Sequence, residues 1–132
     1  MKNLIYSIVI IFCISSCGKD EQVTPSRDKF FGTYTVVESC QSGNYNYDIT
    51  ISSSAENEST VLIGNFGNFK TSAKATVMNN IMTIPNQTLN IQGNSLTINS
   101  GTGSLNGNLL ILSYGYSDGP MTENCSMNCT KK

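Results

Sequence analysis

The residue types that most often perform catalysis near neutral pH are poorly represented in this chain. It contains no histidine, so the usual general base is missing and neither a Ser-His nor a Cys-His nucleophile pair can form. Two carboxylates could still act together as an acid and a base, as they do in glycosidases. The scattered acidic side chains, however, lie in or beside predicted turns and strand edges, where a solvated charge is ordinary: Asp48, Glu56, Glu58, Asp118 and Glu123. We therefore expect a protein that is not an enzyme.

Two further patterns have both a chemical and a structural interpretation. The segment Gly101-Thr102-Gly103 resembles part of a phosphate-binding loop, but no helix pattern and no P-loop lysine follow it, so a bulge or kink in a strand is the better interpretation. Four tyrosines at strand spacing could line a ligand cavity or form a sugar-stacking face, and tyrosine in this pattern also serves as half-buried packing. They are Tyr45, Tyr47, Tyr114 and Tyr116.

The first cysteines indicate where the protein goes. Residues Ile14-Ser15-Ser16-Cys17 have the order of a bacterial lipobox: an aliphatic residue, two small residues and the cysteine that receives the lipid. Lys2 and a short apolar run precede them, so residues 1–16 are predicted to be a signal peptide, because the run is shorter than the roughly 20 residues of a membrane-spanning helix. Cys13 is a poorer acceptor because the bulky Phe12 precedes it. We predict that Cys17 carries acyl chains such as palmitate.

Residues 17–29 are predicted to be a flexible tether, because they are polar and have no apolar periodicity. Their beginning, Gly18-Lys19-Asp20-Glu21, resembles the Lys-acidic-acidic signal that sends lipoproteins of Bacteroidetes-type bacteria to the outer face of the outer membrane. The same residues are also compatible with a solvated linker. The expected location is the outer membrane, with the lipid-anchored protein facing the cell exterior, and the periplasmic face is the alternative.

Composition limits the remaining possibilities. About 116 residues follow the signal peptide, and residues 30–132 suit one domain with one core. The formal net charge is −1 and charged residues are 13% of the chain, so no basic face is available for nucleic acid. No cofactor is expected. Asn, Ser, Thr and Gly alternate with Val, Ile, Leu and Tyr at strand spacing, which favours a folded β domain over disorder.

Turn signals recur about every dozen residues, with no helical period between them. The fifth predicted strand contains Pro85, where we expect a bulge or bend because proline donates no ladder hydrogen bond. The seventh strand is apolar on both faces and is expected to be the most enclosed. Asn79-Asn80 and Asn106-Gly107 are predicted hairpin turns, the second of type I′. The eight predicted strands are residues 32–39, 45–51, 60–66, 69–78, 81–92, 95–105, 108–116 and 121–130.

An even number of strands in simple succession lets the last strand pair antiparallel with the first, which closes a barrel and removes both exposed edges. This pairing places Cys40 opposite Cys125 and brings Cys129 near Val36. Cys125 and Cys129 would be about 13 Å apart in a strand, beyond the roughly 7 Å limit for a disulfide. We therefore predict a bridge between Cys40 and Cys125. A metal site at Cys125 and Cys129 would lack a histidine and a fourth ligand.

The residues Phe31-Gly32-Thr33-Tyr34, the eight-strand succession and the closing cysteines together resemble the small lipocalin-like, calycin-type lipoproteins of Bacteroidetes. Lipocalins proper carry Gly-x-Trp in the first strand, where this chain has Gly32-Thr33-Tyr34 and contains no tryptophan. The resemblance implies an all-β, eight-stranded antiparallel up-and-down barrel whose interior either holds a small apolar molecule or is filled.

Two classes of function are consistent with these patterns. In the first, the membrane-anchored barrel is a non-catalytic binding module for a small apolar ligand, a glycan or a protein. In the second, it is a protein inhibitor or structural accessory of the lysozyme-inhibitor type, and the polar loop at residues 52–59 would contact the partner. A small or absent internal void is expected, because Ala73 and Ala75 indicate a crowded interior.

Overall fold

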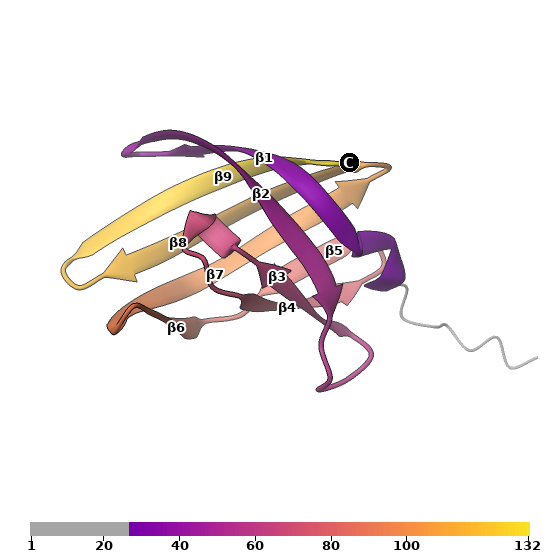
Figure 1. Cartoon of the computed structure of the whole chain (residues 1–132), viewed down its shortest axis with the longest axis horizontal. Coiled ribbons are helices and arrows are strands. Elements are labelled where there is room, and N and C mark those ends of the chain that lie inside the picture. Colours follow the sequence, from indigo (N-terminus) through magenta and orange to yellow (C-terminus); the bar gives the residue numbers. More distant parts are fainter. Residues whose placement is uncertain (1–26) are drawn as a thin grey trace, which may run out of the picture.

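The computed structural model describes residues 27–132, which form an all-β domain with two short 3-10 helices (Figure 1). The signal peptide at residues 1–16, the lipid acceptor Cys17 and most of the predicted tether lie outside the described residues. The strands are β1 (Gly32–Cys40), β2 (Gly43–Ser53), β3 (Thr60–Gly64), β4 (Ala73–Met78), β5 (Ile81–Ile84), β6 (Gln87–Ile91), β7 (Asn94–Asn106), β8 (Leu109–Asp118) and β9 (Met121–Lys131). The 3-10 helices are η1 (Arg27–Phe30) and η2 (Phe66–Asn68).

The strands close into an eight-stranded antiparallel barrel, as the sequence predicts. Strand β1 pairs with β2 on one side and with β9 on the other, and β5 pairs with β7, which completes the ring. The ninth segment, β6, is the second half of the predicted fifth strand. The chain breaks that strand after Ile84, directly before Pro85, and β5 and β6 then pair with opposite halves of β7. The predicted interruption at Pro85 is confirmed.

The interior of the barrel is filled by apolar side chains that alternate with polar ones along each strand. On β1, for example, Tyr34 and Val36 are fully buried while Thr35 and Val37 face outward. This period of two is what a sheet with one dry face requires. The largest fully buried side chains are Tyr34, Phe30, Phe66, Ile49, Ile51, Ile63, Met82, Ile84, Ile98, Leu110, Leu112 and Met127.

The structure corrects the prediction for the seventh strand, which is β8. Its Leu110 and Leu112 are buried, but Leu109 and Ile111 are 40% and 43% exposed. A strand of a single-layer barrel always has one outer face, and no other element within residues 27–132 covers this one. An apolar residue at every position therefore does not make a barrel strand enclosed.

Strand β7 also differs from its prediction. The register shift lies between Ile98 and Ser100, and not at the Gly101-Thr102-Gly103 segment where a bulge was expected. The glycines serve close packing instead: a Cβ on Gly103 would lie 2.2 Å from Leu112 Cδ2 and 2.8 Å from the carbonyl oxygen of Ile111. Strands β7 and β8 can approach this closely only because Gly103 has no side chain.

The predicted turn at Asn79-Asn80 is where the sequence places it, whereas the predicted turn at Asn106-Gly107 differs in position and in type. Residues 79–80 connect β4 to β5, and Asn79 adopts a positive φ of 53°, as predicted. The prediction for the turn between β7 and β8 is wrong by one position, since Asn106 still pairs with Leu109 and the two-residue loop is 107–108. Of these residues only Gly107 has a positive φ, whereas a type I′ turn needs two.

One end of the barrel is closed by η1, which begins three residues before the predicted start of the domain at residue 30. Phe30 is fully buried across this end, and the Tyr34 hydroxyl donates a hydrogen bond of 2.9 Å to its carbonyl oxygen. Lys131 of β9 donates to the Lys29 carbonyl oxygen at 2.8 Å, and its ammonium lies 5.5 Å from the centre of the Tyr34 ring. Tyr34 thus joins η1 to the first and last strands. In residues 27–132, no helix is long and apolar enough to cross a membrane.

Candidate binding site at the open end of the barrel

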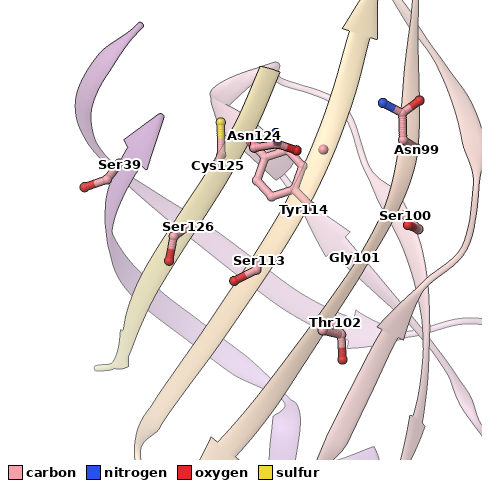
Figure 2. A pocket seen from close by; sticks show the side chains of 11 residues that line it. Ser39, Asn99, Ser100, Gly101, Thr102, Ser113, Tyr114, Asn124, Cys125 and Ser126 are labelled. Carbon is pink, nitrogen blue, oxygen red and sulfur yellow. The ribbon is translucent and has the colours of Figure 1, made fainter. Parts of the chain in front are cut away.

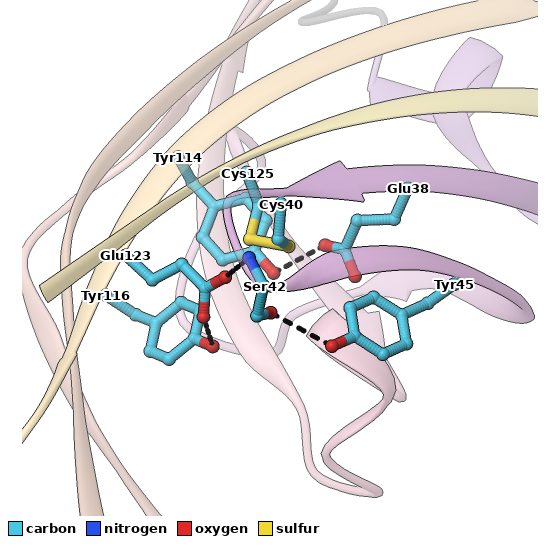
Figure 3. Close-up of a disulfide and its surroundings, with 8 residues drawn as sticks. All are labelled: Glu38, Cys40, Ser42, Tyr45, Tyr114, Tyr116, Glu123 and Cys125. Atoms are coloured by element: carbon cyan, nitrogen blue, oxygen red, sulfur yellow. Dashed lines mark hydrogen bonds between the residues drawn. A yellow bond between two sulfur atoms is a disulfide. The ribbon is translucent and has the colours of Figure 1, made fainter. Parts of the chain in front are cut away.

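The end of the barrel opposite η1 is open and contains a hollow with a volume of about 250 Å³, which we call the mouth hollow. It lies between the β1–β2 hairpin, strand β8 and the β3–β4 connection, elements that Figure 1 shows on its left, and Figure 3 draws its lining residues Glu38, Cys40, Tyr45, Tyr114 and Tyr116. Its lining residues are Glu38, Cys40, Tyr45, Gly67, Asn68, Phe69, Tyr114 and Tyr116. Four of these side chains are aromatic and one is a carboxylate.

Glu38 is the charged residue at the base of the mouth hollow. It follows Tyr34 and Val36 on the inward face of β1, and it is only 2% exposed. The Tyr114 hydroxyl donates a hydrogen bond of 2.6 Å to Glu38 Oε1 (Figure 3). A buried carboxylate is costly unless hydrogen bonds or an opposite charge compensate it. The position of Glu38 therefore calls for a partner.

The surroundings of Glu38 act on its pKa in opposite directions. Burial has the largest effect and raises the pKa above its ordinary value, and the nearby charge of Glu123 raises it further. The hydroxyls of Tyr114 and Tyr47 lower it, because they favour the ionised form. The net result is a raised pKa, so the ionised form of Glu38 is held at a cost.

The two inner tyrosines stay protonated and serve as donors. Burial raises the pKa of Tyr114 far above its ordinary value, and the hydrogen bond to Glu38 raises it further. Burial also raises the pKa of Tyr47, with the charge of Glu38 as the next cause. The Tyr47 hydroxyl is buried beside the carboxylate, yet it makes no hydrogen bond of regular geometry with any described residue. The Tyr114 hydroxyl thus donates to Glu38, and the Tyr47 hydroxyl is free to turn toward the same carboxylate.

The aromatic rings form a connected group around the mouth hollow. Tyr114 lies 4.6 Å from Phe66 and 6.2 Å from Tyr116, and Tyr116 lies 5.5 Å from Phe69, measured between ring centres. Phe66 is the first residue of η2, and Phe69 directly follows this helix. Gly67 allows this packing, because a Cβ there would lie 2.4 Å from Phe69 and 2.9 Å from the Tyr114 hydroxyl.

A second hollow of about 420 Å³ adjoins the mouth hollow and shares Tyr116 with it; we call it the rim hollow. Glu123 lines the rim hollow and contacts Tyr116, which lines both hollows. Its carboxylate accepts hydrogen bonds of 2.5 Å from the Ser42 amide and from the Tyr116 hydroxyl, and these bonds hold its pKa below the ordinary value, Ser42 having the larger effect. Ser42 Oγ also contacts the Tyr45 hydroxyl at 2.9 Å. The rim is therefore acidic and ordered.

The predicted disulfide between Cys40 and Cys125 is present at the mouth, and the pairing of Val36 with Cys129 is also as expected. The Cys40 and Cys125 sulfurs and a Glu38 oxygen lie within 4.8 Å of one another, but the sulfurs are bonded to each other and are not available as metal ligands. Cys129 is a buried free thiol whose pKa is raised to about 12 by burial and by the charge of Glu38. A thiol with this pKa reacts slowly in disulfide exchange.

The largest hollow described, about 610 Å³, is a groove on the outer face of β7, β8 and β9 (Figure 2). Hydroxyl and amide side chains supply most of its lining: Ser39, Asn99, Ser100, Thr102, Ser113, Asn124 and Ser126. No carboxylate or ammonium group is among its lining residues. Hydrogen bonding is the main chemistry this groove offers, whereas the mouth hollow combines a charge with aromatic rings.

The structure brings together all four tyrosines singled out in the sequence. Tyr45, Tyr114 and Tyr116 line the mouth hollow, and Tyr47 lies beside its carboxylate. Glu38 is the residue that sequence reasoning missed. A signal was present, because a glutamate occupies an inward position of the first strand, where the alternation predicts an apolar side chain.

Comparison with protein-family models and with curated protein sequences gives no match to this chain.

Proposed function

We propose that this protein is a lipid-anchored, non-catalytic binding protein of the bacterial envelope, and that its ligand occupies the mouth hollow. The observation that carries this proposal is Glu38, a carboxylate buried among aromatic rings at the open end of an otherwise apolar barrel. Concave sites lined by aromatic side chains with one precisely placed polar group are typical of small-molecule binding. The interior below the mouth is filled with apolar side chains, so a ligand at the mouth is favoured over one in the centre.

The position of the two ends supports a membrane-anchored role. The described chain begins at Arg27, at the closed end of the barrel, and the mouth lies at the opposite end (Figure 1). If Cys17 carries lipid, nine residues lie between it and Arg27, so the two residues are at most about 35 Å apart. The closed end then faces the membrane, and the mouth faces away from it toward solutes. The Lys-acidic-acidic signal after Cys17, within Gly18-Lys19-Asp20-Glu21, favours display on the outer face of the outer membrane.

A protein-binding role of the lysozyme-inhibitor type is the second candidate. Met121 is 75% exposed on the β8–β9 hairpin beside the rim hollow, which favours contact with a partner at this end. The loop expected to make such contacts lies at the closed end instead. There the Arg27 guanidinium donates hydrogen bonds to carbonyl oxygens at both ends of the loop, those of Ser54 and Thr60.

Two measurements test the proposal. Intact-mass analysis of protein purified from its native host should show acyl chains on Cys17 and loss of residues 1–16. An NMR screen of the folded domain against a mixed library of cationic, neutral and anionic small molecules should shift the amide resonances of Gly67 and Asn68 at the mouth. If the library compounds bind only elsewhere on the protein, or do not bind, the result would contradict a binding role for the mouth hollow.

A further inference from the structure

We propose that the mouth hollow selects a small organic cation, an ammonium group with short apolar substituents, over neutral and anionic compounds of the same shape. This inference rests on the proposed binding function and names the chemical class of its ligand. Three features of the site carry it: the unpaired carboxylates, the aromatic lining and the size.

The carboxylates of the mouth have no cationic partner. Two acids elsewhere in the domain are paired at the surface, Glu56 with Lys74 and Asp48 with Lys132. Within residues 27–132, no lysine or arginine forms an ion pair with Glu38 or Glu123. Their hydrogen bonds come from neutral donors, the tyrosine hydroxyls and the Ser42 amide. The mouth therefore carries negative charge that a bound cation would neutralise.

The aromatic rings suit the same ligand. An ammonium group near the face of a tyrosine or phenylalanine is attracted by the ring, and the attraction increases when both are removed from water. Tyr45, Phe69, Tyr114 and Tyr116 line the hollow from three different segments of the chain. A hydrated inorganic ion gains little from such surfaces. Methyl or methylene groups next to the nitrogen would bury apolar area against the rings while the charge faces Glu38.

Burial of Glu38 adds selectivity. Desolvation of this buried carboxyl opposes its ionisation and raises its pKa. A bound cation supplies the missing opposite charge at short range. A neutral molecule of the same shape would remove the remaining water and leave the charge unpaired, which costs free energy. An anion would in addition be repelled by both Glu38 and Glu123.

The volume limits the size of the cation. A volume of about 250 Å³ lies below the roughly 300 to 1,000 Å³ of sites for drug-sized ligands. The mouth hollow therefore suits a group as small as trimethylammonium or butylammonium and is too small for a whole polyamine. A longer substituent can extend past Tyr116 into the rim hollow, where Glu123 and Asp118 are among the lining residues. This exit favours a polar or second cationic group at the far end of the ligand.

The test compares choline with its neutral carbon isostere, 3,3-dimethylbutan-1-ol. Binding to the intact folded domain is measured by NMR titration of the Gly67 amide at pH 7.5. We expect choline to bind at least tenfold more tightly than the isostere. Glu38→Gln should weaken choline binding at least tenfold and should not weaken binding of the isostere, because the variant lacks the charge that a neutral ligand leaves unpaired. Glu58→Gln, an exposed acid at the closed end, is the matched control and should behave as the wild type.

The outcomes separate this inference from the proposed function. Equal affinities for choline and the isostere would overturn the selection of a cation and leave the mouth as a binding site. The same conclusion follows if neutral or anionic library members shift the mouth resonances while choline does not. If no compound of any charge shifts them, both the inference and the binding role of the hollow are overturned. A wild-type-like NMR spectrum of Glu38→Gln establishes that the variant is folded.

Discussion

Removing the disulfide is predicted to cost roughly 4 to 5 kcal/mol of stability. The bridge joins Cys40 to Cys125 across 85 positions, so it closes a loop of about 86 residues in the unfolded chain. In the chain-entropy model, a loop of this length stabilises the folded state by about 4.6 kcal/mol at 25 °C. A domain of this size has a total stability of about 5 to 15 kcal/mol. Its melting temperature should therefore fall by roughly 18 to 37 °C, because each kcal/mol corresponds to about 4 to 8 °C.

The assay is urea unfolding followed by far-ultraviolet circular dichroism, with the oxidised protein and a Cys40→Ala/Cys125→Ala variant measured side by side. Reduction of the wild type should reproduce the loss seen in the variant, and the variant itself should not respond to the reductant. Cys129→Ala in both backgrounds removes the one remaining thiol of residues 27–132 and so prevents exchange during unfolding. A difference below about 1 kcal/mol would refute the reasoning, because it would mean that the bridge does not restrict the unfolded chain.

Three further predictions concern single positions. Burial raises the folded-state pKa of Glu38, so the stability due to its neutral form is present at low pH and is lost as the pH rises through that pKa. The stability of Glu38→Gln relative to wild type should therefore be higher at pH 8 than at pH 4. An equal difference in stability at the two pH values would contradict this prediction. Lys131→Met removes the contacts to η1 and the Tyr34 ring and should cost about 1 to 2 kcal/mol in urea unfolding. Gly103→Ala places a methyl against Leu112 and should cost about 1 to 3 kcal/mol; an unchanged midpoint would show that β7 and β8 can separate.

The fold could be predicted from the sequence because its determinants are local. Alternation of apolar and polar residues defines each strand, turn residues define the connections, and an even strand number makes closure possible. The position of the disulfide followed from that closure, since the pairing of β1 with β9 sets Cys40 opposite Cys125. The errors arose where the outcome depends on neighbouring strands. Leu109 and Ile111 are exposed because no second layer within residues 27–132 covers the outer face of β8, and the place of the β7 bulge depends on its pairing with β8; a single strand's pattern contains neither.

The candidate site was harder to predict because it depends on one exception to the pattern. The tyrosines were recognisable by type and spacing, but their convergence depends on the β3–β4 connection, whose positive-φ residues Asn65, Asn68 and Lys70 bring Phe69 over the mouth. Glu38 lies in the middle of a strand and belongs to no motif. Its only signal is its inward position in the alternation of β1, because the same glutamate one position along would be an ordinary surface charge.

The seam between β1 and β9 is fastened at both of its ends, by Lys131 against η1 at one and by the disulfide at the other. Strands β1 and β9 come from the beginning and the end of the domain, so the barrel cannot close until the last dozen residues have been synthesised. On the export route that we propose, the polypeptide would therefore still be open while it passes through a secretion pore. Closure of the barrel and oxidation of the two cysteines would then coincide on the far side of the membrane.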